Sequence, residues 1–166
     1  MSFSLIKLTK DEILSIPLDD NLGKEQRTEK NYARVTMGEM RGILADDSRK
    51  IALRKKVQSL FFEKIGGNYA KLDVLAQVKQ NTFQKWMNGS TTIGRVNLAK
   101  FLVGLGIDID SADELFSLQS HPLNCSGDRF DHIVAKALKD KDEIENFADS
   151  VMTYCPELMR YFENSG

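Results

Sequence analysis

Apolar residues recur at intervals of three and four through most of the chain after residue 48. Between Arg49 and Ile65 they form a single stripe, which consists of Leu53, Val57, Leu60, Phe61 and Ile65. Residues at this spacing lie on one face of an α-helix, so the stripe predicts an amphipathic helix with one buried face. Similar stripes predict helices near residues 95–105, 108–118, 130–138, 144–152 and 156–162. We therefore expect an all-α fold of about seven to nine helices, with at most one short strand pair near the N-terminus.

Capping residues mark several of these predicted helix ends. Gly66-Gly67 and Gly106 follow predicted helices, where glycine is favoured because it adopts the left-handed conformation without strain. Asp108 is a typical N-cap for the helix that follows it. The run Asp140-Lys141-Asp142-Glu143 predicts a capping box at the start of the next-to-last helix.

Residues 1–48 are less periodic and predict an N-terminal extension. Capping boxes at Thr9–Glu12 and Thr36–Glu39 predict two short helices, the first ended by Pro17 and the second running to about residue 44. Asp46, Asp47 and Ser48 are then candidate caps for a separate helix from Arg49. The apolar residues Phe3, Leu5 and Leu8 fit a short strand or an arm. We expect the extension to pack on the adjacent domain, and an arm that binds DNA or a partner is the alternative.

Residues 68–89 predict two short helices joined by a tight turn. Asn68 is a typical cap for the first helix, which should direct Leu72 and Leu75 inward. Val78 falls in the turn and should pack between the two helices.

The second of these helices, expected from Lys79 to Met87, has two contrasting faces. One arc carries only hydrogen-bonding side chains, which are Gln80, Asn81, Gln84, Lys85 and Asn88. The opposite arc is mainly apolar and carries Lys79, Thr82, Phe83, Trp86 and Met87. Gln and Asn can pair with adenine in the major groove, and Lys can reach guanine. The pattern therefore favours a helix that contacts DNA bases, although an ordinary surface helix has the same polar outer face.

Charge is distributed unevenly along the chain. The net charge is −1, but residues 49–107 carry 11 basic and 2 acidic side chains, a balance of +9. Residues 1–48 carry −2 and residues 108–166 carry −8. No acidic residue lies between Val74 and Ile107. A basic block around the paired helices is the charge distribution expected where a protein contacts phosphates.

Residues 68–89 also resemble the helix-turn-helix of the Cro/repressor-type family, known as XRE-like or lambda-repressor-like. The resemblance rests on Leu72, Val78, Thr82, Phe83, Trp86, Asn88-Gly89 and the helix that ends at Leu105-Gly106. The chain departs from the family pattern at Asp73, Gln77 and Lys79, where the family usually has a small residue, a glycine and a Ser or Thr cap. Residues 92–150 are similar to a C-terminal extension of some such regulators, with the patterns ADELFSLQSHPL and DRFDHIVAKAL.

The resemblance implies a sequence-specific regulator of transcription, a repressor that binds double-stranded DNA as a homodimer. It divides the chain into an N-terminal extension (1–48), a helix-turn-helix domain (49–107) and a C-terminal helical extension (108–166) for dimerisation or partner binding. The candidate base-contacting residues are Gln80, Asn81, Gln84 and Lys85. The candidate phosphate-contacting residues are Lys71, Lys79, Asn88, Thr91 and Arg95. The expected dimer surface comprises Phe147, Val151, Leu158 and Phe162.

A second function stays open. The acidic C-terminal part also fits an antitoxin or inhibitor, which would use the same helical fold to bind a protein partner. No glycine-rich phosphate loop, HExxH motif or nucleophile elbow occurs in the sequence, so we expect neither an enzyme nor a cofactor. Cys125, Cys155, His121 and His132 have no metal-ligand spacing, and we expect free thiols in a cytoplasmic protein. No apolar run reaches about 18 residues, so no membrane span is expected.

Overall fold

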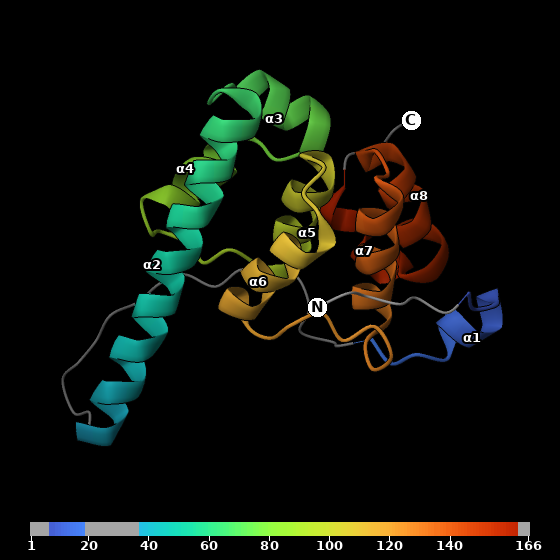
Figure 1. Cartoon of the computed structure of the whole chain (residues 1–166), viewed down its shortest axis with the longest axis horizontal. Helices are drawn as coiled ribbons and strands as arrows, with labels where there is room; N and C mark the ends of the chain where they lie inside the picture. Colours follow the sequence, from blue (N-terminus) through green and yellow to red (C-terminus); the bar gives the residue numbers. More distant parts are fainter. Residues whose placement is uncertain (1–6, 19–36, 163–166) are drawn as a thin grey trace.

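The chain is helical throughout its regular parts, and no described residue belongs to a β-strand (Figure 1). The computed structural model describes residues 7–18 and 37–162, with side chains from residue 47 onward in the second range. The helices are α1 (Lys10–Leu14), α2 (Met37–Ile65), α3 (Tyr69–Ala76), α4 (Gln80–Met87), α5 (Arg95–Gly104), α6 (Ile109–Gln119), α7 (Arg129–Asp140), α8 (Ile144–Tyr154) and the 3-10 helix η1 (Pro156–Tyr161). The expected all-α fold class is confirmed.

Helix α5 lies at the centre of the hydrophobic core. It contacts α3, α6, α7, α8 and η1, and its side chains Leu98, Phe101 and Leu102 have no exposed surface. Gly104, its last residue, allows α3 to approach closely. A Cβ atom at Gly104 would lie only 2.4 Å from the backbone oxygen of Leu75. The core around α5 therefore fixes the position of the short helix α3.

Helix α2 is a single helix, so the expected break at Asp46–Ser48 is wrong. Its 29 residues would span about 43 Å at the usual rise of about 1.5 Å per residue. Asp and Ser are only mildly unfavourable inside a helix, and no proline interrupts this one. In Figure 1 the N-terminal half of α2 extends away from the other helices, and its C-terminal half packs on α3, α4 and α6. Thr36, the expected start of a capping box, lies outside the described residues.

The C-terminal helices differ from expectation at one junction. Asp108 caps α6 as expected, by accepting a hydrogen bond from the Ser111 amide at 3.2 Å. The capping box expected at Asp140–Glu143 is wrong, because Asp140 still belongs to α7 and Glu143 makes no side-chain cap bond. Lys141 instead adopts a left-handed conformation (φ 55°) that ends α7. Hydrogen bonds to the last carbonyls of α7 stabilise this turn, as after many helices.

The hydrophobic core is continuous across the expected domain boundary at residue 107. A single cluster of buried side chains extends from Ile13 in α1 to Phe162 after η1. The four apolar residues expected to form a dimer surface belong to this cluster and are at most 6% exposed. That expectation is wrong, because Phe147, Val151, Leu158 and Phe162 already stabilise the chain's own core.

The first described segment packs on the C-terminal helices. Thr9 and Glu12 form the expected capping box of α1, with hydrogen bonds of 3.2 and 3.1 Å. The Arg129 guanidinium donates to the backbone oxygens of Leu14, Ile16 and Tyr154 at 2.8 to 3.0 Å. These bonds hold α1 against α7 and α8, as expected for an extension that packs on the domain. Phe3 and Leu5, expected in a strand or arm, lie outside the described residues.

Candidate nucleic-acid interface

Helices α3 and α4 are joined by a short turn with an unusual backbone conformation. The Asn68 side chain accepts a hydrogen bond from the Lys71 amide at 3.1 Å and caps α3, as expected. Gln77 follows α3 in the left-handed conformation (φ 54°, ψ 37°), which turns the chain toward α4. Val78 is 2% exposed in the turn, also as expected. Leu75 is 40% exposed, so its expected inward position is wrong, and Ala76 occupies the buried position instead.

The inner face of α4 is held by aromatic packing. Phe83 and Trp86 are 1% and 0% exposed. The ring centroids of Phe83 and Phe61 on α2 lie 4.4 Å apart, and those of Phe83 and Phe101 on α5 lie 6.1 Å apart. Because large buried rings contribute strongly to packing, these contacts fix the orientation of α4 about its own axis.

The outer face of α4 carries the four expected base-contacting residues. Gln80, Asn81, Gln84 and Lys85 are all exposed. The helix begins at Gln80, one residue later than expected, with Lys79 as its N-cap. An amide-rich face on a rigidly packed helix can place hydrogen-bonding groups at the edges of bases.

Three of the five expected phosphate-contacting residues are exposed. Lys71 lies in the first turn of α3, Lys79 is the N-cap of α4 and Asn88 follows α4. The Lys79 ammonium lies 3.0 Å from both carboxylate oxygens of Asp73, which neutralises part of its charge. The Asn88 side-chain oxygen accepts hydrogen bonds from the amide and hydroxyl of Ser90 at 2.8 and 2.5 Å. Of the two lysines, Lys71 is therefore the one whose charge no described carboxylate neutralises.

Of the other two expected phosphate contacts, that of Arg95 is wrong. Arg95 is only 3% exposed, and its guanidinium forms two 2.9 Å bonds with the carboxylate of Asp131. It also donates to Gln119, Ser120, His121 and Pro122 in and after α6. The hydroxyl oxygen of Thr91 is buried as well. The Arg95 guanidinium cannot reach a phosphate, because it is enclosed by the protein's own packing. Thr91 is partly exposed as a residue, and its contact with a phosphate stays a prediction.

Sequence reasoning missed a cation beside α4. Arg54 on α2 comes so close to the end of α4 that a Cβ atom at Gly89 would lie 2.8 Å from its Nη1. The basic run that contains Arg54 was a signal, but the run alone does not show which side chain faces α4. Lys55 and Lys56 line a groove between α2 and α6 instead, and Lys56 lies 3.5 Å from Glu114. Only knowledge of the neighbouring helices separates Arg54 from the two lysines.

The two cysteines are free thiols, with Cys155 buried and Cys125 partly buried. Burial raises the pKa of Cys125 to about 11 and that of Cys155 to about 12. Both are therefore protonated at neutral pH and are poor nucleophiles and metal ligands. Within residues 7–18 and 37–162, no three His, Cys, Asp or Glu side chains are grouped so that they could hold a metal ion.

Comparisons of the chain with protein-family models, with curated proteins and with solved structures found no match. None of the described helices combines the length and apolar character needed to cross a membrane. The helix-turn-helix resemblance thus depends on the residues of α3, α4 and the turn between them, and it stays a prediction.

Proposed function

We propose that this protein is a sequence-specific DNA-binding regulator of the XRE-like helix-turn-helix type, which contacts the major groove with α4. The observation that carries the proposal is the exposed face of Gln80, Asn81, Gln84 and Lys85 on a helix anchored from behind by aromatic rings. Amides can pair bidentately with adenine, and an ammonium group can reach guanine. A rigid helix holds these groups in one register along the groove.

The conformation of Gln77 supports the family assignment. The corresponding position of the family is usually glycine, the residue that most easily adopts positive φ. Gln77 departs from the family in residue type but has a φ of 54°. The turn thus has the positive φ that the usual glycine adopts easily.

The cations around α4 support contact with the phosphate backbone. Lys79 is exposed at its N-cap, Lys71 is exposed on the preceding helix α3, and Arg54 lies beside its end. Each cation that neutralises a phosphate releases counterions and makes binding more sensitive to salt. Arg95 is excluded from this set by its burial.

The test begins by selecting a preferred duplex from genomic fragments, followed by fluorescence anisotropy on that duplex and on random DNA. Gln84→Ala should weaken binding to the selected duplex by about 1 to 3 kcal/mol and change binding to random DNA little. Lys71→Ala should weaken binding to both and lower the salt slope by about one counterion. Asn146→Ala and Arg160→Ala are matched controls, because they remove an exposed amide and an exposed cation from α8 and η1.

Base contact by α4 would be contradicted if Gln80 and Gln84 could both be replaced by alanine without loss of affinity for any DNA. The far-ultraviolet circular dichroism would have to stay unchanged, so that the fold is known to be intact. The second candidate function, an antitoxin or inhibitor that binds a protein partner, would then be favoured. The charge of −8 on residues 108–166 is the observation that supports it, with exposed carboxylates at Asp110, Glu114, Glu145 and Asp149.

We also propose that the regulator acts as a homodimer. One short helix contacts few base pairs, so such domains usually pair to bind half-sites about one turn of duplex apart. Sedimentation equilibrium with and without the selected duplex tests this. A monomer under both conditions at tens of micromolar would contradict it.

A further inference from the structure

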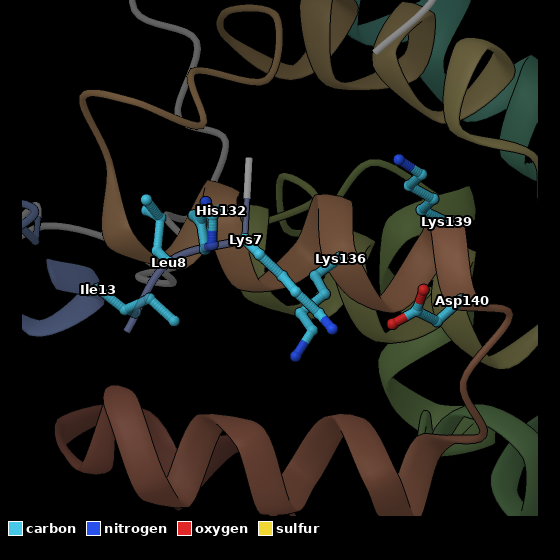
Figure 2. Close-up of a pocket in the computed structure, with 7 residues that line it drawn as sticks. All are labelled: Lys7, Leu8, Ile13, His132, Lys136, Lys139 and Asp140. Carbon is cyan, nitrogen blue, oxygen red and sulfur yellow. The ribbon is translucent and has the colours of Figure 1, made fainter. Parts of the chain in front are cut away.

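A cavity of about 290 Å³ lies between the first described segment and α7 (Figure 2). Leu8 and Ile13 line one side of it. On the other side, α7 contributes His132, Lys136 and Asp140, which are spaced four residues apart and so lie on one face of the helix. The cavity therefore combines an apolar wall with a polar helix face.

The apolar wall of this cavity is built into the fold. Ile13 is 4% exposed and belongs to the hydrophobic core. The three hydrogen bonds from Arg129 fix the end of α1 to α7 and α8, and the Arg129 amide donates to the Pro17 oxygen at 2.8 Å. The segment that carries Leu8 and Ile13 is thus anchored at its C-terminal side. Such pre-formed cavities with a few polar groups are typical of small-molecule sites.

The cavity is cationic although the surrounding C-terminal part is acidic. In Figure 2 the side chains of Lys7 and Lys136 extend to the same side of α7, the side that faces α8, and Lys139 extends to the other side. Among the described residues, neither Lys7 nor Lys136 forms an ion pair. Asp140 also lines the cavity, so Lys7, Lys136 and Asp140 together carry a net charge of +1. Lys139 adds one more positive charge at the edge of the cavity.

His132 adds a neutral polar group. It is 5% exposed, and burial lowers its pKa from the ordinary value of 6.5, so the imidazole is uncharged at neutral pH. Asp142 lies near Lys136 and Asp140, and burial raises its pKa. The positive charge in the cavity at neutral pH thus comes from the lysines.

We propose that this cavity binds a small organic anion, with its carboxylate or phosphate between Lys7 and Lys136 and its apolar part against Leu8 and Ile13. Charge-assisted hydrogen bonds to two ammonium groups would give the site its preference for an anion. A volume of 290 Å³ has room for about ten groups the size of a water molecule, at about 30 Å³ each. The ligand is therefore a small metabolite-sized molecule with a short apolar group.

Isothermal titration calorimetry on the full chain tests this with octanoate, hexyl phosphate, octanol and octylammonium. Octanoate or hexyl phosphate should bind, and octanol and octylammonium should bind at least tenfold more weakly. Lys136→Gln and Lys7→Gln should each weaken anion binding by about tenfold or more, since each removes a charged hydrogen-bond donor. Lys64→Gln is the matched control, because it removes an exposed lysine at the end of α2. In a methyl-labelled sample, the Ile13 methyl resonances should shift as the anion binds.

Three results would overturn the proposal. The first is that neither anion binds at millimolar concentration. The second is that octanol binds as tightly as octanoate. The third is that Lys136→Gln and Lys7→Gln weaken binding no more than Lys64→Gln does. None of these measurements involves DNA, so their failure would leave the proposed function of α4 untouched. Conversely, a chain that binds no DNA can still bind the anion.

Discussion

Replacing Arg95 with alanine should lower the free energy of unfolding by about 3 to 5 kcal/mol. The side chain joins α5 to α7 through two 2.9 Å bonds with Asp131, which has no exposed surface. In the alanine variant the Asp131 carboxylate would stay buried without its cationic partner. It would keep neutral hydrogen bonds such as that from the Asn124 amide at 2.9 Å. A buried charge that loses its partner costs far more than an exposed ion pair contributes.

The structure adds further losses to the same substitution. Arg95 donates to four residues in and after α6, and its guanidinium carbon lies 4.7 Å from the Phe116 ring centroid. A domain is usually stable by about 5 to 15 kcal/mol, so the loss would be a large fraction of the total. For a chain of this size, the midpoint of thermal unfolding should fall by about 6 to 20 °C.

Urea unfolding, followed by circular dichroism and by Trp86 fluorescence, measures the effect. Arg49→Ala is the matched control, because its exposed guanidinium donates to the Ser117 and Ser120 oxygens near the same end of α6. It should lose less than about 1 kcal/mol, as is usual for exposed groups. The double variant Arg95→Met with Asp131→Leu should be less destabilised than the sum of its single variants, because it leaves no unpaired buried charge.

The reasoning fails if Arg95→Ala is no less stable than Arg49→Ala, or if the double variant loses the full sum. A second result would contradict the structure directly. Arg95→Ala would stay fully folded while the salt slope of DNA binding fell by about one counterion, which is the behaviour of a phosphate contact.

Three further predictions concern single residues. Burial lowers the pKa of His132 in the folded chain below the ordinary value of 6.5 that applies to the unfolded chain. Between the folded and unfolded pKa values the unfolded chain binds more protons, so stability falls as the pH falls through that window. Urea unfolding from about pH 7.5 to about pH 5 should show that His132→Gln removes this loss, in contrast to the wild type. Cys155, with its pKa raised to about 12, should react with a thiol reagent only after unfolding, and rapid reaction in the folded state would contradict its burial. Gly104→Ala should cost about 1 to 3 kcal/mol despite the helix preference of alanine, because its Cβ would clash with α3, and thermal unfolding with no loss would refute that clash.

The features predicted correctly from the sequence depend on neighbours along the chain. The caps at Asn68 and Asp108 act within one helical turn, and the stripe from Leu53 to Ile65 repeats every three or four residues. A stripe at helical spacing must face something apolar, so it predicts burial even when the partner is unknown. The aromatic inner face of α4 was predictable for the same reason, because Phe83 and Trp86 are three residues apart.

The errors concern features that depend on distant partners. Arg95 lies in a basic block, but its partner Asp131 follows 36 residues later in an acidic segment. No local pattern shows that these two side chains meet inside the core. The expected dimer surface on α8 and η1 was wrong for the same reason. An apolar stripe predicts burial, but it does not show whether the chain itself or a second copy covers it. The continuous α2 is a different case, since Asp and Ser favour helix starts but do not prevent a helix from continuing.

Gln77 combines both kinds of information, and one comparison tests its backbone. The sequence has Gln77 where the helix-turn-helix family that it resembles usually has glycine, and the structure gives a φ of 54° at that position. A left-handed conformation costs a residue with a Cβ atom about 1 to 2 kcal/mol, whereas glycine adopts it freely. Gln77→Gly should therefore be more stable than Gln77→Ala by roughly 1 kcal/mol after the greater flexibility of unfolded glycine is subtracted. At Asp149, an exposed position inside α8, the order should reverse, with alanine more stable than glycine by about 1 kcal/mol. Urea unfolding of the four variants gives both differences, and the same order at both positions would show that residue 77 is not left-handed in solution.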